Sequence, residues 1–162
     1  MRRAPFISLA LAILLCSCDT SPVDVAGNYT LAITNHENGC GFQNWVEGES
    51  SSNVPLTITQ NGHDVTAILE GVTGVWVDAV LGEKTFTGTV SGHDLEVVLH
   101  GTRSLSQGGC TYTVIATARA ELSGDTLTGS IGYTPATNGS PDCGALEGCV
   151  STQAFNGTRP PP

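Results

Sequence analysis

Four cysteines spread along the chain are the residues whose type and spacing best indicate covalent chemistry: Cys40, Cys110, Cys143 and Cys149. An even number of cysteines is typical of disulfides in an exported protein, because the compartments outside the cytoplasm are oxidising. A zinc site would need ligand spacing such as Cys-x-x-Cys, which is missing, and the histidines show no such spacing to these cysteines. We therefore expect two disulfides and no metal or other cofactor.

Two histidines, His63 and His93, occur in a repeated Gly-His-Asp turn and raise the alternative of a metal site. The third version of this turn, Ser123-Gly124-Asp125, has no histidine. The chain also lacks the dense alternating carboxylates of a calcium loop. Turn chemistry is sufficient to explain these residues.

Motifs typical of catalysis are missing from the chain. There is no Gly-x-Ser-x-Gly elbow, no His-Glu-x-x-His and no glycine-rich phosphate loop before a helix. Glu47 and Glu49 lie in a polar stretch, where a solvated surface explains them better than an acid–base pair. We expect a protein that is not an enzyme.

Large aromatic residues are the best candidates for a binding surface. Residues 71–83 are apolar although they connect two predicted strands, and Trp76, Ala79 and Val80 have the spacing of a short helix. Such a helix would either plug the core or act as a lid. Together with Trp45 and Tyr112, Trp76 is predicted to bind a ligand, because aromatic side chains supply much contact area.

The first eighteen residues are typical of an export signal. Two arginines are followed by an apolar run and then by Leu15-Cys16-Ser17-Cys18. This ending resembles the bacterial lipobox, which implies that Cys18 is the lipidated first residue of the mature protein. Cys16 fits less well because bulky Leu15 precedes it. The alternative is an ordinary cleaved signal without a lipid.

The charge balance excludes one class of partner. Six basic and fifteen acidic residues give a net charge of −9. Removal of the signal segment takes away Arg2 and Arg3 and no acidic residue, so the mature protein has four basic and fifteen acidic residues, a net charge of −11. Nucleic acids and anionic lipid surfaces bind clustered lysine and arginine, so we expect neither as a direct partner.

Alternation of polar and apolar residues predicts an all-β fold of about eight strands. Apolar positions with a period of two mark the strands as follows: Tyr29–Ile33, Val54–Ile58, Val65–Leu69, Phe86–Val90, Leu95–Leu99, Tyr112–Ala118, Leu127–Tyr133 and roughly 150–158. Three tight turns at Gly62, Gly92 and Gly124 join these strands into hairpins.

The remaining connections are long: roughly 36–52, 71–83, 101–109 and 135–149. In an up-and-down meander the short turns fall at one end and the long loops at the other. This arrangement predicts all four cysteines near one rim. Closure into a barrel would remove both exposed sheet edges.

The chain resembles the lipocalin-like, calycin-type barrels. The resemblance rests on Gly27-Asn28-Tyr29 at the start of the first strand and on Phe155-Asn156-Gly157-Thr158-Arg159 at the end of the last. It implies that Arg159 covers the aromatic residue of the first strand, here Tyr29. It also implies binding of a small ligand at the open end, although the strands are short for a deep cup.

The disulfide pairing stays open between two alternatives. In a closed meander the first and last strands are neighbours, which favours Cys40–Cys149 with Cys110–Cys143. The other pairing is a local Cys143–Cys149 bridge with Cys40–Cys110 across the rim. Either pairing would fix loops that are otherwise long.

We therefore expect a signal peptide (1–18), a tether (19–25), one barrel domain (26–159) and a short tail (160–162). The expected function is non-catalytic binding of a small apolar or aromatic molecule at the disulfide-bonded loop end. The alternative is a filled barrel that contacts an envelope protein. The expected location is the bacterial cell envelope, on an outer membrane or a periplasmic membrane face, with the cell surface as a further alternative. There the lipid of a monomer would insert. Because the first strand starts near the anchor, the long loops should point away from the membrane.

Overall fold

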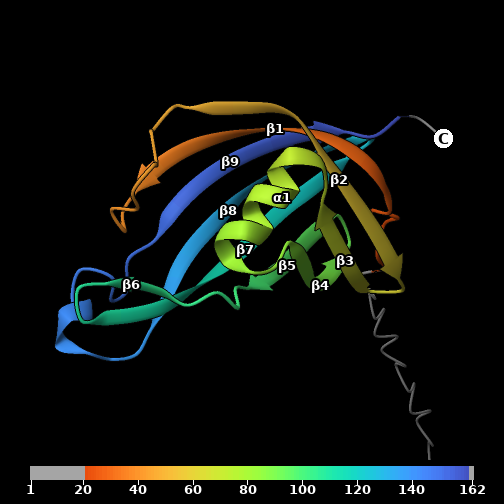
Figure 1. Cartoon of the computed structure of the whole chain (residues 1–162). Coiled ribbons are helices and arrows are strands. Elements are labelled where there is room, and N and C mark those ends of the chain that lie inside the picture. Colours follow the sequence, from red (N-terminus) through yellow and green to blue (C-terminus); the bar gives the residue numbers. More distant parts are fainter. Residues whose placement is uncertain (1–20, 161–162) are drawn as a thin grey trace, which may run out of the picture.

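The computed structural model describes residues 21–160, and nearly all of them belong to one antiparallel β-barrel (Figure 1). In chain order the elements are β1 (Gly27–Asn38), β2 (Ser50–Asn61), β3 (Asp64–Leu69), α1 (Gly71–Leu81), β4 (Thr85–Ser91), β5 (Asp94–His100), β6 (Leu105–Gln107), β7 (Cys110–Ser123), β8 (Thr126–Thr137), the short 3-10 helix η1 (Pro141–Cys143) and β9 (Ser151–Thr158). The predicted all-β class is confirmed.

Eight of the strands close into a ring. Each of them pairs antiparallel with its neighbour in the order β1-β2-β3-β4-β5-β7-β8-β9, and β9 returns to pair with β1. Neighbours in the ring are also neighbours along the chain, apart from the pairs β5–β7 and β9–β1. The predicted up-and-down barrel is therefore confirmed, and its sheet has no free edge within the ring.

One strand was not predicted. Residues 105–107, expected to be part of a loop, form β6, which pairs with the first residues of β7 outside the ring. Gly108, in a left-handed conformation with φ of 60°, turns the chain back on itself. Three residues are too few for an alternation pattern to show, so this strand could not be recognised from the sequence.

The interior is filled by the alternating apolar residues of the strands. Tyr29, Leu99 and Leu127 are among the most completely buried side chains. The space that remains between the inward-facing side chains of the barrel is only about 40 Å³. This space is about the size of one or two water molecules, so the barrel has no deep cup.

The two ends of the barrel differ as the meander predicts. The tight turns at Gly62, Gly92 and Gly124 lie at one end, and they connect strands directly. In Figure 1 both ends of the described chain lie at this end, opposite β6 and the segment that follows β8. We call the tight-turn end the base and the long-loop end the mouth.

Arg159 ties the two ends of the chain together at the base. Its guanidinium carbon lies 5.8 Å from the centre of the Tyr29 ring, and its Nη1 donates to the carbonyl oxygen of Ala26 at 2.6 Å. Its Nε donates to a carboxylate oxygen of Asp125 at 3.1 Å. The hydroxyl of Tyr29 donates to the carbonyl of Val25 at 2.9 Å. The structure thus has the contact between Arg159 and Tyr29 that the family resemblance implied.

Candidate functional site

Two disulfides fix the loops at the mouth. Cys40 is bonded to Cys149, and Cys110 is bonded to Cys143. This is the pairing that the neighbour relation of the first and last strands favoured. Cys40, Cys110 and Cys143 are buried with Leu146 in a small apolar cluster of their own, separate from the barrel core. Both bridges therefore belong to one compact structure at the rim.

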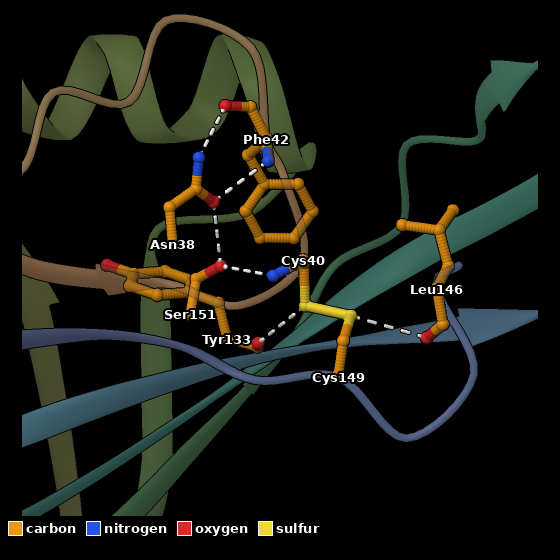
Figure 2. The surroundings of a disulfide bond; sticks show 7 residues. All are labelled: Asn38, Cys40, Phe42, Tyr133, Leu146, Cys149 and Ser151. Atoms are coloured by element: carbon orange, nitrogen blue, oxygen red, sulfur yellow. Dashed lines mark hydrogen bonds between the residues drawn. A yellow bond between two sulfur atoms is a disulfide. The ribbon is translucent and has the colours of Figure 1, made fainter.

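A polar network around the buried Ser151, beside the Cys40–Cys149 bridge, holds the start of the loop that follows β1 (Figure 2). Ser151, fully buried, accepts the N–H of Cys40 at 3.1 Å and donates to the side-chain oxygen of Asn38 at 3.0 Å. The same oxygen accepts the N–H of Phe42 at 2.8 Å, and the Asn38 amide donates to the Phe42 carbonyl at 2.9 Å. Asn38 thus holds the backbone of Phe42 on both sides.

Helix α1 covers the other side of the mouth. It ends at Leu81 and is capped by Gly82, which has a left-handed backbone and whose N–H donates to the Asp78 carbonyl at 2.7 Å. Its buried residues are Gly74, Val77 and Leu81. A methyl group at Gly74 would collide with the carbonyl oxygen of Leu69, so this glycine lets the helix approach the end of β3.

The predicted helix is confirmed, but the three residues whose spacing indicated it do not share one environment. Trp76 is 61% exposed and Ala79 is exposed, while Val80 alone packs against the core. Because the segment is apolar on nearly all sides, its periodicity does not select a face. The close approach that Gly74 allows determines the face instead.

A cavity of about 380 Å³ lies at the mouth between the loop after β1, helix α1 and strand β6. Phe42 and Trp45 line it from the loop, Trp76 and Val77 from α1, and Tyr112 from β7. All three residues predicted to bind a ligand, Trp45, Trp76 and Tyr112, are therefore brought together around one space. Phe42 was not singled out from the sequence, although its position three residues before Trp45 on the same loop was available as a signal.

The Trp45 ring is held in place from several directions. It meets the Tyr133 ring edge to face, with 5.7 Å between centroids and 78° between planes, and it lies 6.4 Å from the Phe42 ring. Its indole N–H donates to the carbonyl of His36 at 3.0 Å. With these contacts made, the ring that lines the cavity is preorganised.

Three polar residues in the wall of the cavity bond to one another. The Tyr133 hydroxyl donates to Gln153 at 2.6 Å, and the Gln153 amide donates to Asn35 at 2.7 Å. Asn35, on β1, in turn donates to the carbonyl of Val46 in the following loop at 3.1 Å. Burial raises the pKa of Tyr133 well above its usual value, so the phenol is a neutral donor. This part of the wall is polar but already satisfied.

The histidines of the repeated turns bond to the backbone of neighbouring strands at the base. The Nδ1 of His63 donates to the carbonyl of Val90 at 2.9 Å, and the Val90 N–H bonds back to the His63 carbonyl at 2.9 Å. His93 and Leu122 make the same exchange, at 2.8 and 3.0 Å. Among residues 21–160, no group of three or more His, Cys, Asp and Glu side chains is arranged to hold a metal ion.

A second hollow, of about 520 Å³, lies on the outside of the barrel near the base. Its lining includes Glu96, Arg119 and Glu121, all exposed, and it has no aromatic residue. Glu96 and Arg119 already form an ion pair there, at 2.9 Å. It is an open depression between surface side chains, and the mouth cavity is the better candidate for a binding site.

The predicted signal peptide and the lipidation residue Cys18 lie outside the described residues. Part of the predicted tether is described, and it is bound to the base: Val23 donates to the carbonyl of Gly92 at 2.9 Å, and Val25 donates to the side chain of Gln60 at 2.7 Å. No helix within residues 21–160 has the length and apolar character needed to cross a membrane.

Comparison of the chain with protein-family models, with curated proteins and with solved structures gave no significant match.

Proposed function

We propose that this protein is a lipid-anchored lipoprotein of the bacterial cell envelope that binds a small apolar or aromatic molecule, without catalysis, in the cavity at its mouth. Cys18 would carry the lipid. The ligand would lie between the loop after β1, helix α1 and strand β6, rather than inside the filled barrel. The protein would act as a monomer.

The observation that carries this proposal is the cavity itself. Its volume of about 380 Å³ lies within the range of small-molecule sites, roughly 300–1,000 Å³. Its lining combines aromatic rings on the loop, the helix and the strands with apolar side chains such as Val80 and Leu105. The two disulfides and the Asn38 network hold the loop side of this cavity in place without a ligand.

The position of the N-terminal segment supports a mouth that faces away from the membrane. Val23 and Val25 are bound at the base, on the opposite side of the barrel from the cavity. A lipid on Cys18 would then lie only a few residues before the first held position, within about 17 Å at 3.3 Å per residue. The base would sit close to the bilayer, and the cavity would be open to the surrounding compartment.

Native mass spectrometry provides the test. The full chain with Cys18→Ala is purified, incubated with a small-molecule extract of its own cell envelope, and weighed. A defined small mass that is retained by this protein, and lost in a Trp45→Ala variant, would support the proposal. Retention of no small mass would contradict it.

A filled barrel that contacts an envelope protein is the second candidate, and the outer surface of α1 favours it. Val72, Val75 and Trp76 are 87%, 68% and 61% exposed, a concentration of apolar side chains on one helix. Cross-linking from residue 72 in intact cells would test it. A single specific protein adduct from that position, absent when the probe is placed at Asn61 at the base, would favour this candidate over the first.

A further inference from the structure

We infer that the ligand of the mouth cavity is an uncharged aromatic molecule whose edge carries hydrogen-bonding groups such as an amide or a hydroxyl. This inference rests on the proposed function and names the chemical class of the ligand. It follows from three properties of the lining: its aromatic content, its lack of charge, and the polar side chains at its opening that have no protein partner.

Aromatic residues are concentrated at this one place. The whole chain has nine, and five of them line the cavity, including both tryptophans. Of the others in the described chain, Tyr29, Phe86 and Phe155 are buried in the barrel core. Rings offer flat, rigid contact area at a small cost in side-chain entropy, and they prefer offset or edge-to-face contact with another ring. The lining is therefore suited to a planar aromatic ligand.

Charge is absent from the same lining. None of the seventeen residues around the cavity is an aspartate, glutamate, lysine, arginine or histidine. A charged ligand would lose part of its hydration there without gaining a partner of opposite charge. An anion would also meet a protein of net charge −9, with Glu47 and Glu147 on the loops of this end. These properties select an uncharged ligand.

The opening has polar side chains that remain available. Gln43 and Asn44 lie on the loop after β1, and Ser106 and Gln107 lie on β6; all four are exposed and line the cavity. Within the described chain, none of these four side chains has a hydrogen-bond partner, and each can donate as well as accept. Two facing segments thus present free amide and hydroxyl groups at the edge of an aromatic space.

The inner part of the cavity differs from its opening. Val77, Leu81 and Val114 are buried and apolar there, and the polar Tyr133 and Gln153 are bonded to each other. A saccharide, with hydroxyl groups on all sides, would leave its inner hydroxyls without partners. A quaternary ammonium would suit the rings but would find no carboxylate in the lining. A ring with one polar edge fits both regions.

A matched series of naphthalene derivatives tests the inference. The full chain in lipid nanodiscs is titrated by calorimetry with 2-naphthamide, 2-naphthoate and 2-naphthyltrimethylammonium, with cellobiose as the saccharide and empty nanodiscs as the blank. The emission of Trp45 and Trp76, the only tryptophans of the chain, reports whether binding occurs at the cavity. We expect the neutral amide to bind about tenfold more tightly than either ion.

Side-chain replacement provides the second arm. Gln107→Leu should weaken 2-naphthamide binding about fivefold to tenfold, since it removes a hydrogen bond at the opening, and should leave unsubstituted naphthalene unaffected. Asn61→Leu, the same kind of change at the base, is the control. An amide affinity unchanged by Gln107→Leu would overturn the polar-edge part of the inference.

The outcomes separate this inference from the proposed function. Binding of the naphthoate or the ammonium as tight as that of the amide, with a change in tryptophan emission, would overturn the uncharged class but leave a small-molecule site. Binding of cellobiose alone, or of none of the four compounds, would overturn the inference and the apolar or aromatic ligand together.

Discussion

Arg159 joins three parts of the base with a single side chain. It bonds to the backbone before β1, pairs with Asp125 in the turn between β7 and β8, and covers the Tyr29 ring. Its side chain is only 19% exposed, so these bonds are partly shielded from water. Contacts of this kind contribute more to stability than an ion pair on the surface.

Replacement of this arginine tests that difference. Arg159→Ala should lower the free energy of unfolding by about 2 kcal/mol, because it removes a charged hydrogen bond and a cation–π contact. Urea denaturation followed by circular dichroism measures the change. Arg119→Ala is the matched control: its ion pair with Glu96 is solvated, so its denaturation midpoint should not move. Equal losses for the two variants would contradict this account of the base.

The raised pKa values of two tyrosines predict a loss of stability at alkaline pH. Burial raises the pKa of Tyr29 and of Tyr133 above the value of an unfolded chain, about 10. Their contribution is complete below pH of about 10. Above it the unfolded state releases protons that the native state retains, so the free energy of unfolding should fall as the pH rises, with Tyr133 contributing up to about 1.4 kcal/mol per pH unit.

Denaturant titrations between about pH 9 and pH 11 measure this slope. Tyr133→Phe should make this slope clearly shallower, whatever the variant does to stability at neutral pH. A slope that Tyr133→Phe leaves unchanged would show that this phenol ionises freely in the native protein.

At the scale of elements, helix α1 has one buried and one exposed face. Val77 and Leu81 complete the barrel core, while Val72, Val75 and Trp76 are exposed. The buried face corresponds to the predicted plug, and the exposed face is the one that the proposed lid would use.

Two alanine variants separate these faces. Val77→Ala should lower the free energy of unfolding by about 1–3 kcal/mol, because it removes buried methyl groups. Trp76→Ala should change it by less than about 0.5 kcal/mol but should weaken binding of 2-naphthamide. Thermal denaturation and calorimetry provide the two measurements. A large loss of stability in Trp76→Ala would mean that its ring is part of the core.

The two disulfides close chain segments of different length. The separation is 109 residues for Cys40–Cys149 and 33 for Cys110–Cys143. On the chain-entropy model, replacing both cysteines of a pair with serine should cost about 5 kcal/mol for the longer loop and about 4 kcal/mol for the shorter. Urea denaturation of the two double variants measures these losses. Unchanged stability in either variant would show that its bridge does not stabilise the fold.

The elements also show what could be predicted locally. The alternation at Tyr29, Leu31 and Ile33 predicts β1 because a strand buries every second residue, and the same holds for the other long strands. Strand β6 and the buried face of α1 could not be predicted from the sequence. The first is too short to show a period, and the second depends on a close contact between Gly74 and Leu69 in a different element.

At the scale of the whole molecule, the orientation proposed for the cavity depends on Cys18. Cys18→Ala should move the protein from the membrane to the soluble fraction of a cell lysate, as measured by immunoblotting after ultracentrifugation. Cys16→Ala is the control and should leave the protein on the membrane, because Leu15 before it does not suit cleavage. Membrane attachment that survives Cys18→Ala would contradict the lipid anchor.

The amino-acid sequence by itself determined the strands, the position of the tight turns and hence the end of the barrel at which every cysteine after Cys18 lies. These features follow from a period of two and from glycine at the turns, both of which act over a few neighbouring residues. The sequence also supplied Trp45, Trp76 and Tyr112 as candidates.

Only the tertiary structure decided that these three aromatic residues share one cavity, that the barrel beneath it is filled, and which cysteines are bonded. Each depends on distances between segments 30 to 110 residues apart along the chain, and such distances are set by closure of the ring and by packing of the loops. The alternation of large and small interior residues was compatible with a pocket or a packed core, because the free volume is a small difference between large volumes that local pattern does not fix.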